Sequence, residues 1–343
     1  MCGSARYREP VIAALLLAFV AQTPVPAAEP AAWKRERGSA EVRSFLEEWR
    51  DESRSRDVPV KLYHPAGDGP FPVVIFSHGL GGTRENYAYL GEHWASHGYV
   101  SVHVQHVGSD DSVWRGNAKP MQAMQHATED LENLLGRPKD VSFAIDELTR
   151  RNALEGWALR GKLDLGALAV AGHSFGAYTS LCSAGRDLVT PLGEKIEVSD
   201  ARVKACIAMS PQGSARDAAN GSWREFACPV FHMTGTKDES PIRGDAKPEE
   251  RRIPFDTIDK AEQYLLIFDG GDHMTFGDRS RLFGARDPAH HPLILSSSTA
   301  FLDAYLKHDA AAFTWLRDGG FTSILGSKGT FEHKEPAPAA SAK

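Results

Sequence analysis

Short apolar runs separated by stretches of helical periodicity recur along the 343-residue chain. After one early run that alternates apolar and polar residues, the others are continuous, as expected of strands that helices bury on both faces. Such strands, alternating with helices, form a mostly parallel sheet, so the pattern predicts an α/β fold. The predicted strands are Val58–Tyr63, Pro72–Ser77, Tyr99–Val104, the run from Leu168 to Gly172, Val203–Met209, Val230–Thr234 and Tyr264–Phe268.

Helical periodicity fills most of the intervals between these strands. The pattern predicts helices around Tyr87–Trp94, at Met121–Leu135, at Asp140–Asn152 and at Leu293–Lys307. Asp140 is the predicted N-cap of the third. Residues 106–164 form a longer excursion than one crossover helix needs, and we expect this excursion to wall part of a substrate pocket.

Composition divides the chain into four segments. Residues 1–28 combine a positive start, an apolar run too short to span a bilayer and a small-residue cleavage site, which predicts the signal peptide of a secreted or periplasmic protein. No later run predicts an integral membrane span. Residues 29–55 are predicted to be a linker or lead-in, 56–333 the folded domain and 334–343 a disordered tail.

Charge and cysteine content narrow the classes of protein further. The formal net charge is -6, and basic residues are interspersed with acidic ones rather than gathered in a stripe, which argues against a nucleic-acid partner. Removal of a signal peptide would leave Cys182, Cys206 and Cys228. All three lie in or beside apolar segments, so we expect buried thiols, with one disulfide among them as the alternative. The oligomeric state is not predicted.

The strongest chemical motif is the sequence Gly172-His173-Ser174-Phe175-Gly176 at the end of an apolar run. In a G-x-S-x-G turn the serine lies on a strained strand-to-helix corner, where side chains at both glycine positions would collide with the backbone. The helix that follows directs its free N–H groups toward the same place. Ser174 is therefore a candidate nucleophile, with a chance match as the alternative.

A glycine-rich loop, His78-Gly79-Leu80-Gly81-Gly82, follows the predicted strand Pro72–Ser77. Loops of this kind let backbone N–H groups approach a ligand closely. By position, the Leu80 N–H and the N–H of Phe175 are candidates to bind an oxyanion at the serine.

A serine nucleophile needs a base that a carboxylate orients, in the chain order Ser, Asp, His. Asp238 follows the strand Val230–Thr234, and His273 follows the strand Tyr264–Phe268. Because the carboxyl ends of parallel strands meet at one edge, we expect Asp238 and His273 to reach Ser174. The carboxylates that could replace Asp238 are Glu239, Asp269 and Asp272. Among the histidines, His78 and His173 flank the loop and the turn, where they are expected to shape the site rather than act as the base. His103 and His106 lack a third ligand at a convincing spacing, so no metal or cofactor is predicted.

With these motifs the chain resembles the α/β-hydrolase superfamily, and within it the platelet-activating factor acetylhydrolase and dienelactone hydrolase-like serine esterases. The resemblance rests on FSHGLGGTRENYAYLGEHWASHGY, GHSFGAYT, GTKD and GGDHMTFGD and covers about Asp57 to Leu306. It implies the triad Ser174, Asp238 and His273, oxyanion donors at Leu80 and Phe175, and no cofactor. Dienelactone hydrolases proper use cysteine, so Ser174 favours the acetylhydrolase or carboxylesterase side.

The expected function is therefore a serine carboxylic ester hydrolase that acts through an acyl-enzyme on short-acyl or lipid-like esters. Three alternatives stay open: a cutinase-like polyester hydrolase, an amide or peptide hydrolase, and a non-catalytic hydrolase fold that binds a ligand or partner.

Overall fold

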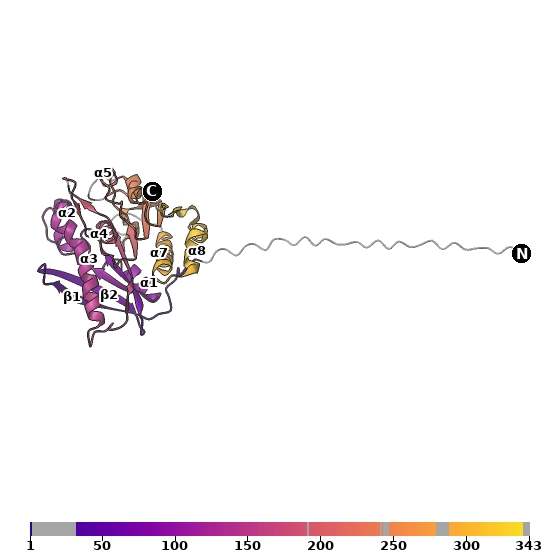
Figure 1. Ribbon diagram of the computed structural model, residues 1–343, viewed down its shortest axis with the longest axis horizontal. Coiled ribbons are helices and arrows are strands. Elements are labelled where there is room, and N and C mark those ends of the chain that lie inside the picture. Colours follow the sequence, from indigo (N-terminus) through magenta and orange to yellow (C-terminus); the bar gives the residue numbers. More distant parts are fainter. Residues whose placement is uncertain (2–31, 191, 241, 243–246, 279–287, 339–343) are drawn as a thin grey trace, which may run out of the picture.

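A twisted nine-stranded sheet lies at the centre of the computed structural model, which describes residues 1, 32–190, 192–240, 242, 247–278 and 288–338 (Figure 1). The strand order is β1-β2-β4-β3-β5-β8-β9-β10-β11. The strands from β4 to β10 in this order are parallel, whereas the pairs β1–β2, β2–β4 and β10–β11 toward the two sides of the sheet are antiparallel. The predicted α/β fold is thereby confirmed.

The strands of this sheet are β1 (Val42–Asp51), β2 (Arg56–Pro65), β3 (Phe71–Ser77), β4 (Val100–Val104), β5 (Leu163–His173), β8 (Ala205–Met209), β9 (Val230–Lys237), β10 (Gln263–Asp272) and β11 (Gly329–Lys334). A separate pair joins β6 (Leu188–Val189) to β7 (Lys195–Ile196). The helices are α1 (Ala88–Ser96), α2 (Pro120–Glu129), α3 (Leu131–Asn152), α4 (Phe175–Ala184), α5 (Ala215–Ala219), α6 (Ile253–Thr257), α7 (His290–Leu306), α8 (Ala310–Arg317) and α9 (Gly320–Leu325), with short 3-10 turns η1 (Asp111–Val113), η2 (Pro248–Arg252), η3 (His273–Phe276) and η4 (Gly326–Lys328).

Each face of the sheet has its own hydrophobic core, because side chains alternate along a strand. On β3, Val74 and Phe76 pack with residues of α1, α7, α8 and α9. The alternate residues Val73 and Ile75 pack on the other face with residues of α3 and α4. Figure 1 shows α3 and α7 on opposite sides of the sheet. The continuous apolar runs of the sequence reflect this burial on both faces.

The predicted lead-in is wrong from Val42 onward, because β1 pairs with β2 along its whole length. Strand β1 is an edge strand in which most side chains are exposed or half-buried, and Trp49 is its one fully buried apolar side chain. An edge strand of this kind lacks the apolar run that identifies a central strand. The folded domain therefore begins before Arg56.

The predicted division between the helices of the excursion is also wrong. Helix α3 begins at Leu131, and its N-cap is Asp130, whose side chain accepts a hydrogen bond from the Glu132 N–H. Asp140, the predicted N-cap, lies inside the helix instead. Pro138 also lies inside α3 and has no N–H to donate to the carbonyl of Leu134, one turn earlier. The Tyr178 hydroxyl of α4 donates to this carbonyl at 3.1 Å instead. This replacement satisfies the orphaned acceptor, and α3 continues through the proline.

The chain ends were predicted to lie outside the fold. The predicted signal peptide lies almost wholly outside the described residues, as do residues 339–343 of the predicted tail. Lys334, by contrast, is the last residue of β11, and the Ala337 N–H donates to the Asp259 carbonyl at 2.7 Å. The tail prediction is therefore wrong at its start.

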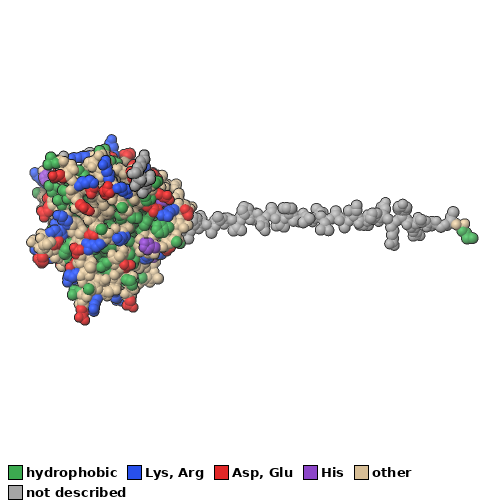
Figure 2. Space-filling view, in the orientation of Figure 1, with side chains coloured by type: hydrophobic (Ala, Val, Ile, Leu, Met, Phe, Trp, Pro, Cys, Tyr) green, Lys and Arg blue, Asp and Glu red, His purple; other side chains and the backbone are tan. Residues whose placement is uncertain are grey.

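The remaining whole-chain features concern membranes, thiols and surface charge. Across the part of the chain that the structure describes, no helix has the length and apolar character needed to cross a membrane. Cys182 and Cys206 are buried free thiols, and Cys228 is a half-buried one. On the face seen in Figure 2, acidic and basic side chains are intermingled.

Candidate active site

The turn between β5 and α4 has the strained geometry that its sequence predicts. Ser174 adopts φ 56° and ψ −117°, a conformation that costs a non-glycine residue about 1–3 kcal/mol. A side chain at Gly176 would collide with the Ser77 carbonyl, and one at Gly172 with the backbone of Gly176. The two glycines thus let β3, β5 and α4 meet closely enough to hold Ser174 in place.

The structure brings the three predicted side chains into one hydrogen-bonded chain. The Ser174 hydroxyl donates to His273 Nε2 at 2.9 Å, and His273 Nδ1–H donates to Asp238 Oδ1 at 2.7 Å. Asp238 is fully buried and also accepts from the Thr234 hydroxyl at 2.8 Å. Each residue directly follows the carboxyl end of a parallel strand: Ser174 follows β5, Asp238 follows β9 and His273 follows β10. Because these strands are parallel, their carboxyl ends lie on the same side of the sheet.

Charge within this chain of hydrogen bonds favours an ionised Asp238. Burial alone would raise the pKa of its carboxyl, but the hydrogen bond with His273 and the positive charge of Arg251 lower it to about 2. The carboxylate is therefore anionic at neutral pH and holds the histidine proton on Nδ1. Nε2 is left free to accept the serine proton.

Of the carboxylates that could have replaced Asp238, none bonds to the His273 ring. Glu239 and Asp269 are exposed, and the Asp272 side chain caps η3 by accepting from the Met274 N–H.

The two predicted oxyanion donors lie on either side of Ser174. Leu80 follows β3 in the glycine-rich loop, and Phe175 is the first residue of α4. Both line the same cavity as Ser174. Within the described residues, neither backbone N–H donates to another protein group. Both donors are thus available to an oxygen atom placed beside Ser174.

The cavity above Ser174 has a volume of about 830 Å³. Its apolar wall includes Leu134 from α3, and Thr128 and Glu129 come from the end of α2. Residues from the 106–164 excursion thus line this cavity. The remaining lining is mixed in character: Leu80, Phe175, Tyr178, Val189, Pro211 and Ile242 are apolar or aromatic, and Arg186, Arg216, Asp217, Lys247, Glu250 and Arg251 are charged.

His173 connects the serine turn to the histidine loop. It donates from Nε2 to the backbone carbonyl of His273 at 2.8 Å and accepts at Nδ1 from the Tyr87 hydroxyl at 2.7 Å. Burial, together with the nearby His273, keeps the pKa of His173 well below its usual value, so the ring is neutral. Both ring nitrogens are thus occupied by Tyr87 and the His273 carbonyl, and neither bonds to Ser174.

Sequence reasoning missed Arg251 of η2. This side chain is 3% exposed, donates from Nε to the Asp238 carbonyl at 3.2 Å and lies 3.4 Å from the Asp238 carboxylate. Its Nη1 donates to the carbonyl of Pro211 at 3.3 Å. Arg251 thus joins the loop after β9 to the end of β8. The sequence carries no signal for its role, because an arginine in the charged stretch Pro248–Arg252 is typical of a solvated surface.

No group of three or more His, Cys, Asp and Glu side chains in the described residues is arranged to hold a metal ion. His106 is instead bonded to Asp140 at Nδ1 and to Ser77 at Nε2, both at 3.0 Å.

A parallel sheet whose edge carries a serine on a strained strand-to-helix turn, next to a histidine and an aspartate, defines an α/β hydrolase. A family model described as platelet-activating factor acetylhydrolase, isoform II, matches residues 54–135. The chain is 24% identical over 265 residues to a cutinase of Thermobifida alba, covering 77% of this chain and 69% of the relative. It is 23% identical over 266 residues to cutinase 1 of Thermobifida cellulosilytica, covering 77% and 80%. It is 28% identical over 312 residues to the platelet-activating factor acetylhydrolase of Cavia porcellus, covering 78% and 66%. The chain is an α/β-hydrolase-like serine ester hydrolase, which confirms the predicted superfamily and enzyme class.

Proposed function

We propose that the enzyme cleaves carboxylic esters through an acyl-enzyme formed on Ser174. The observation that carries the proposal is the hydrogen-bonded series Ser174, His273, Asp238, which opens onto a cavity beside two free backbone N–H groups. Arrangements of this kind activate a serine hydroxyl, which is a poor nucleophile by itself.

In the first half-reaction, His273 Nε2 takes the proton of Ser174 as its Oγ bonds to the ester carbonyl carbon. The carbonyl oxygen becomes an oxyanion, which the N–H groups of Leu80 and Phe175 bind. Collapse of this intermediate breaks the bond to the alcohol oxygen, and His273 returns the proton to the departing alcohol. Water then attacks the acyl-enzyme by the same steps, and Asp238 stays ionised throughout.

The cavity volume supports lipid-like esters over the shortest acyl esters. About 830 Å³ lies near the upper end of the usual range for small-molecule sites, and an acetyl group would leave most of it unfilled. We therefore expect activity on p-nitrophenyl octanoate to exceed activity on p-nitrophenyl acetate. A preference for acetate would favour the short-acyl alternative.

The Ser174→Ala variant tests the central assignment. We expect kcat on p-nitrophenyl butyrate to fall by about 10⁵-fold or more, because the nucleophile is lost. A fluorophosphonate probe should label the parent enzyme on Ser174 and leave the variant unlabelled. Ester turnover by Ser174→Ala at the parent rate would contradict the assignment, and absence of turnover in the parent enzyme would favour the non-catalytic alternative.

Polyester hydrolysis is the second candidate, and the similarity to proteins named cutinases favours it. Release of soluble products from an aliphatic polyester film, at a rate that Ser174→Ala abolishes, would support a polymer substrate. Hydrolysis of soluble esters alone would exclude it.

We also propose that residues 1–28 direct export to the periplasm or the medium. Mass spectrometry of the exported protein should then give a mature N-terminus at Glu29. Retention of residues 1–28 on exported protein would contradict cleavage.

A further inference from the structure

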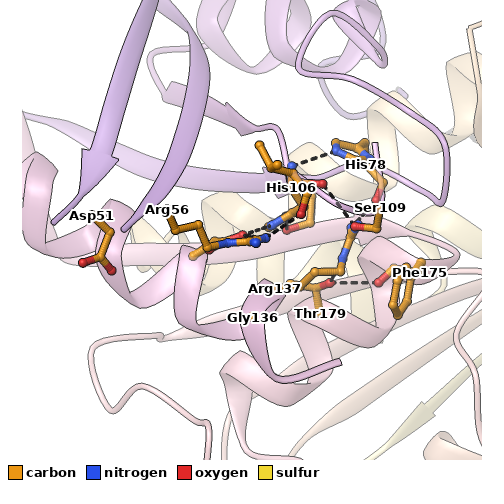
Figure 3. A network of polar contacts seen from close by, with 12 residues as sticks. Asp51, Arg56, His78, His106, Ser109, Gly136, Arg137, Phe175 and Thr179 are labelled. Carbon is orange, nitrogen blue, oxygen red and sulfur yellow. Dashed lines mark hydrogen bonds and ion pairs between the residues drawn. The ribbon is translucent and has the colours of Figure 1, made fainter. Parts of the chain in front are cut away.

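Arg137 is a fully buried arginine in α3 whose direct hydrogen-bond acceptors are all uncharged oxygens (Figure 3). Its Nε donates to the Thr179 hydroxyl at 2.7 Å, and its Nη1 donates to the Ser109 hydroxyl at 2.8 Å. Its Nη2 donates to the backbone carbonyl of His78. The guanidinium carbon also lies 4.5 Å from the centre of the Phe175 ring.

These contacts reach both segments that carry the candidate oxyanion donors. The His78 carbonyl belongs to the loop two residues before Leu80. On the other side, the Thr179 hydroxyl donates to the Phe175 carbonyl at 2.8 Å, and Arg137 packs on the Phe175 ring. One side chain thus connects the loop after β3 to the first turn of α4. Neither segment can shift against the other without breaking a bond to this guanidinium.

The charge of Arg137 is also unusual for its surroundings. Burial lowers the pKa of its guanidinium to about 9, against the opposing charge of Asp140, so it remains cationic at neutral pH. The Asp140 carboxylate accepts from Arg54, Arg56 and His106 and not from Arg137. A buried cation without a carboxylate in contact is costly unless negative charge develops nearby. An oxyanion beside Leu80 and Phe175 would supply that charge during each catalytic cycle.

We propose that Arg137 is a positioning residue for the oxyanion hole, which it holds in shape from both sides and whose anion it stabilises through its charge. The inference rests on the proposed function, because it requires Leu80 and Phe175 to bind the oxyanion. A purely structural arginine would lower the stability of the fold when removed, without distinguishing the transition state from bound substrate.

The test compares Arg137→Met and Arg137→Lys with the control Arg56→Met. Arg56 belongs to the same polar network and bonds to Asp140 and to the Val107 carbonyl, but it contacts neither oxyanion segment. For each variant, kcat and KM on p-nitrophenyl butyrate, the Ki of an alkyl trifluoromethyl ketone and the thermal unfolding midpoint are measured. The ketone is the informative probe because its serine adduct places an oxyanion in the hole.

For Arg137→Met we expect kcat to fall by about 10- to 100-fold, less than the loss of a direct oxyanion donor, with KM changed by less than about threefold. The Ki of the ketone should rise by the same factor as kcat/KM falls. Arg137→Lys keeps the charge but not all three bonds, so it should lie between the parent enzyme and Arg137→Met. Arg56→Met should keep kcat and Ki within about threefold, even if its unfolding midpoint falls.

Two results would overturn the inference: Arg137→Met with parental kcat and Ki, or equal losses of kcat in Arg137→Met and Arg56→Met. If Arg137→Met does not fold, Thr179→Val replaces it as the test. This variant removes the hydroxyl that links Arg137 to the Phe175 carbonyl. Parental kcat and Ki in Thr179→Val would then count against the inference. Failure of the proposed function itself is separate, since it would appear as no Ser174-dependent turnover in the parent enzyme.

Discussion

The Asp238 carboxylate has both oxygens engaged, with Oδ1 accepting from His273 and Oδ2 from Thr234. Its neighbour Glu239 is exposed and contacts neither the histidine nor the serine. This difference between adjacent acidic residues offers a matched pair of variants.

We expect Asp238→Asn to lower kcat by about 10³- to 10⁴-fold with little change in KM. An amide can donate to Nδ1, which would favour the histidine tautomer with its proton on Nε2 and no lone pair for Ser174. Steady-state kinetics on a p-nitrophenyl ester measures the effect. Glu239→Gln is the control and should keep parental kcat; an equal loss in both variants would contradict the assignment of Asp238.

For single residues, the sequence pointed to the candidate side chains that directly follow strands but not to buried side chains that lie elsewhere in the fold. Ser174, Asp238 and His273 each follow an apolar run, and the sheet brings the ends of these runs together. Arg137 lies in mid-helix and Arg251 in a short charged turn. These two side chains are buried only by packing against residues that are distant in the sequence, so no local sequence pattern indicates their burial.

At the scale of elements, Asp140 joins α3 to the sheet. Its carboxylate accepts from Arg54 in the turn before β2, from Arg56 at the start of β2 and from His106 just after β4, at 2.7 to 3.0 Å. Burial alone would raise the pKa of this carboxyl, but the bonds from His106 and Arg56 lower it to about 2, from an ordinary value of 3.8.

We expect Asp140→Asn to lower the free energy of unfolding by about 3–5 kcal/mol at pH 7, because it leaves Arg56 without its buried carboxylate and leaves Arg54 with Asp51 alone. The carboxylate is depressed in the fold, so its contribution is complete above about pH 4 and is lost as the pH falls through about 2. The difference between the two proteins should shrink over that interval. Urea unfolding at a series of pH values measures it.

Asp146→Asn is the control for this experiment. Asp146 forms an exposed ion pair with Arg202, so its loss should cost less than about 1 kcal/mol at any pH. A gap between Asp140→Asn and the parent protein that stays constant down to pH 2 would contradict the assigned ionisation of Asp140.

The sequence failed to predict β1 and the course of α3, because each contains a residue that is unusual for its kind of element. Strand β1 turns Glu47 inward, where it accepts from the indoles of Trp49 and Trp157, so a polar residue occupies a position that a central strand would fill with an apolar one. Helix α3 contains Pro138, which normally ends a helix, and a hydroxyl from α4 makes its continuation possible. In both cases a distant partner overrides the local preference.

On the scale of the whole molecule, one edge of the parallel sheet gathers side chains that are about 100 residues apart. Ser174 and His273 are 99 positions apart and share a hydrogen bond. The order of the apolar runs was enough to predict this meeting, since parallel strands place their carboxyl ends together. The cavity could not be predicted in the same way, because its lining combines α2, α3, β6, α5 and η2.

The boundary at Asp130, between α2 and α3, has a consequence for redesign of this enzyme. Helix α2 contributes Thr128 and Glu129 to the cavity from a segment that carries none of the proposed reacting groups, so we expect changes in α2 to alter substrate selectivity without removing a reacting group. Helix α3 places Leu134 in the same wall and Arg137 one turn further on. Changes before Asp130 would alter which esters enter, whereas changes after it would alter selectivity and turnover together.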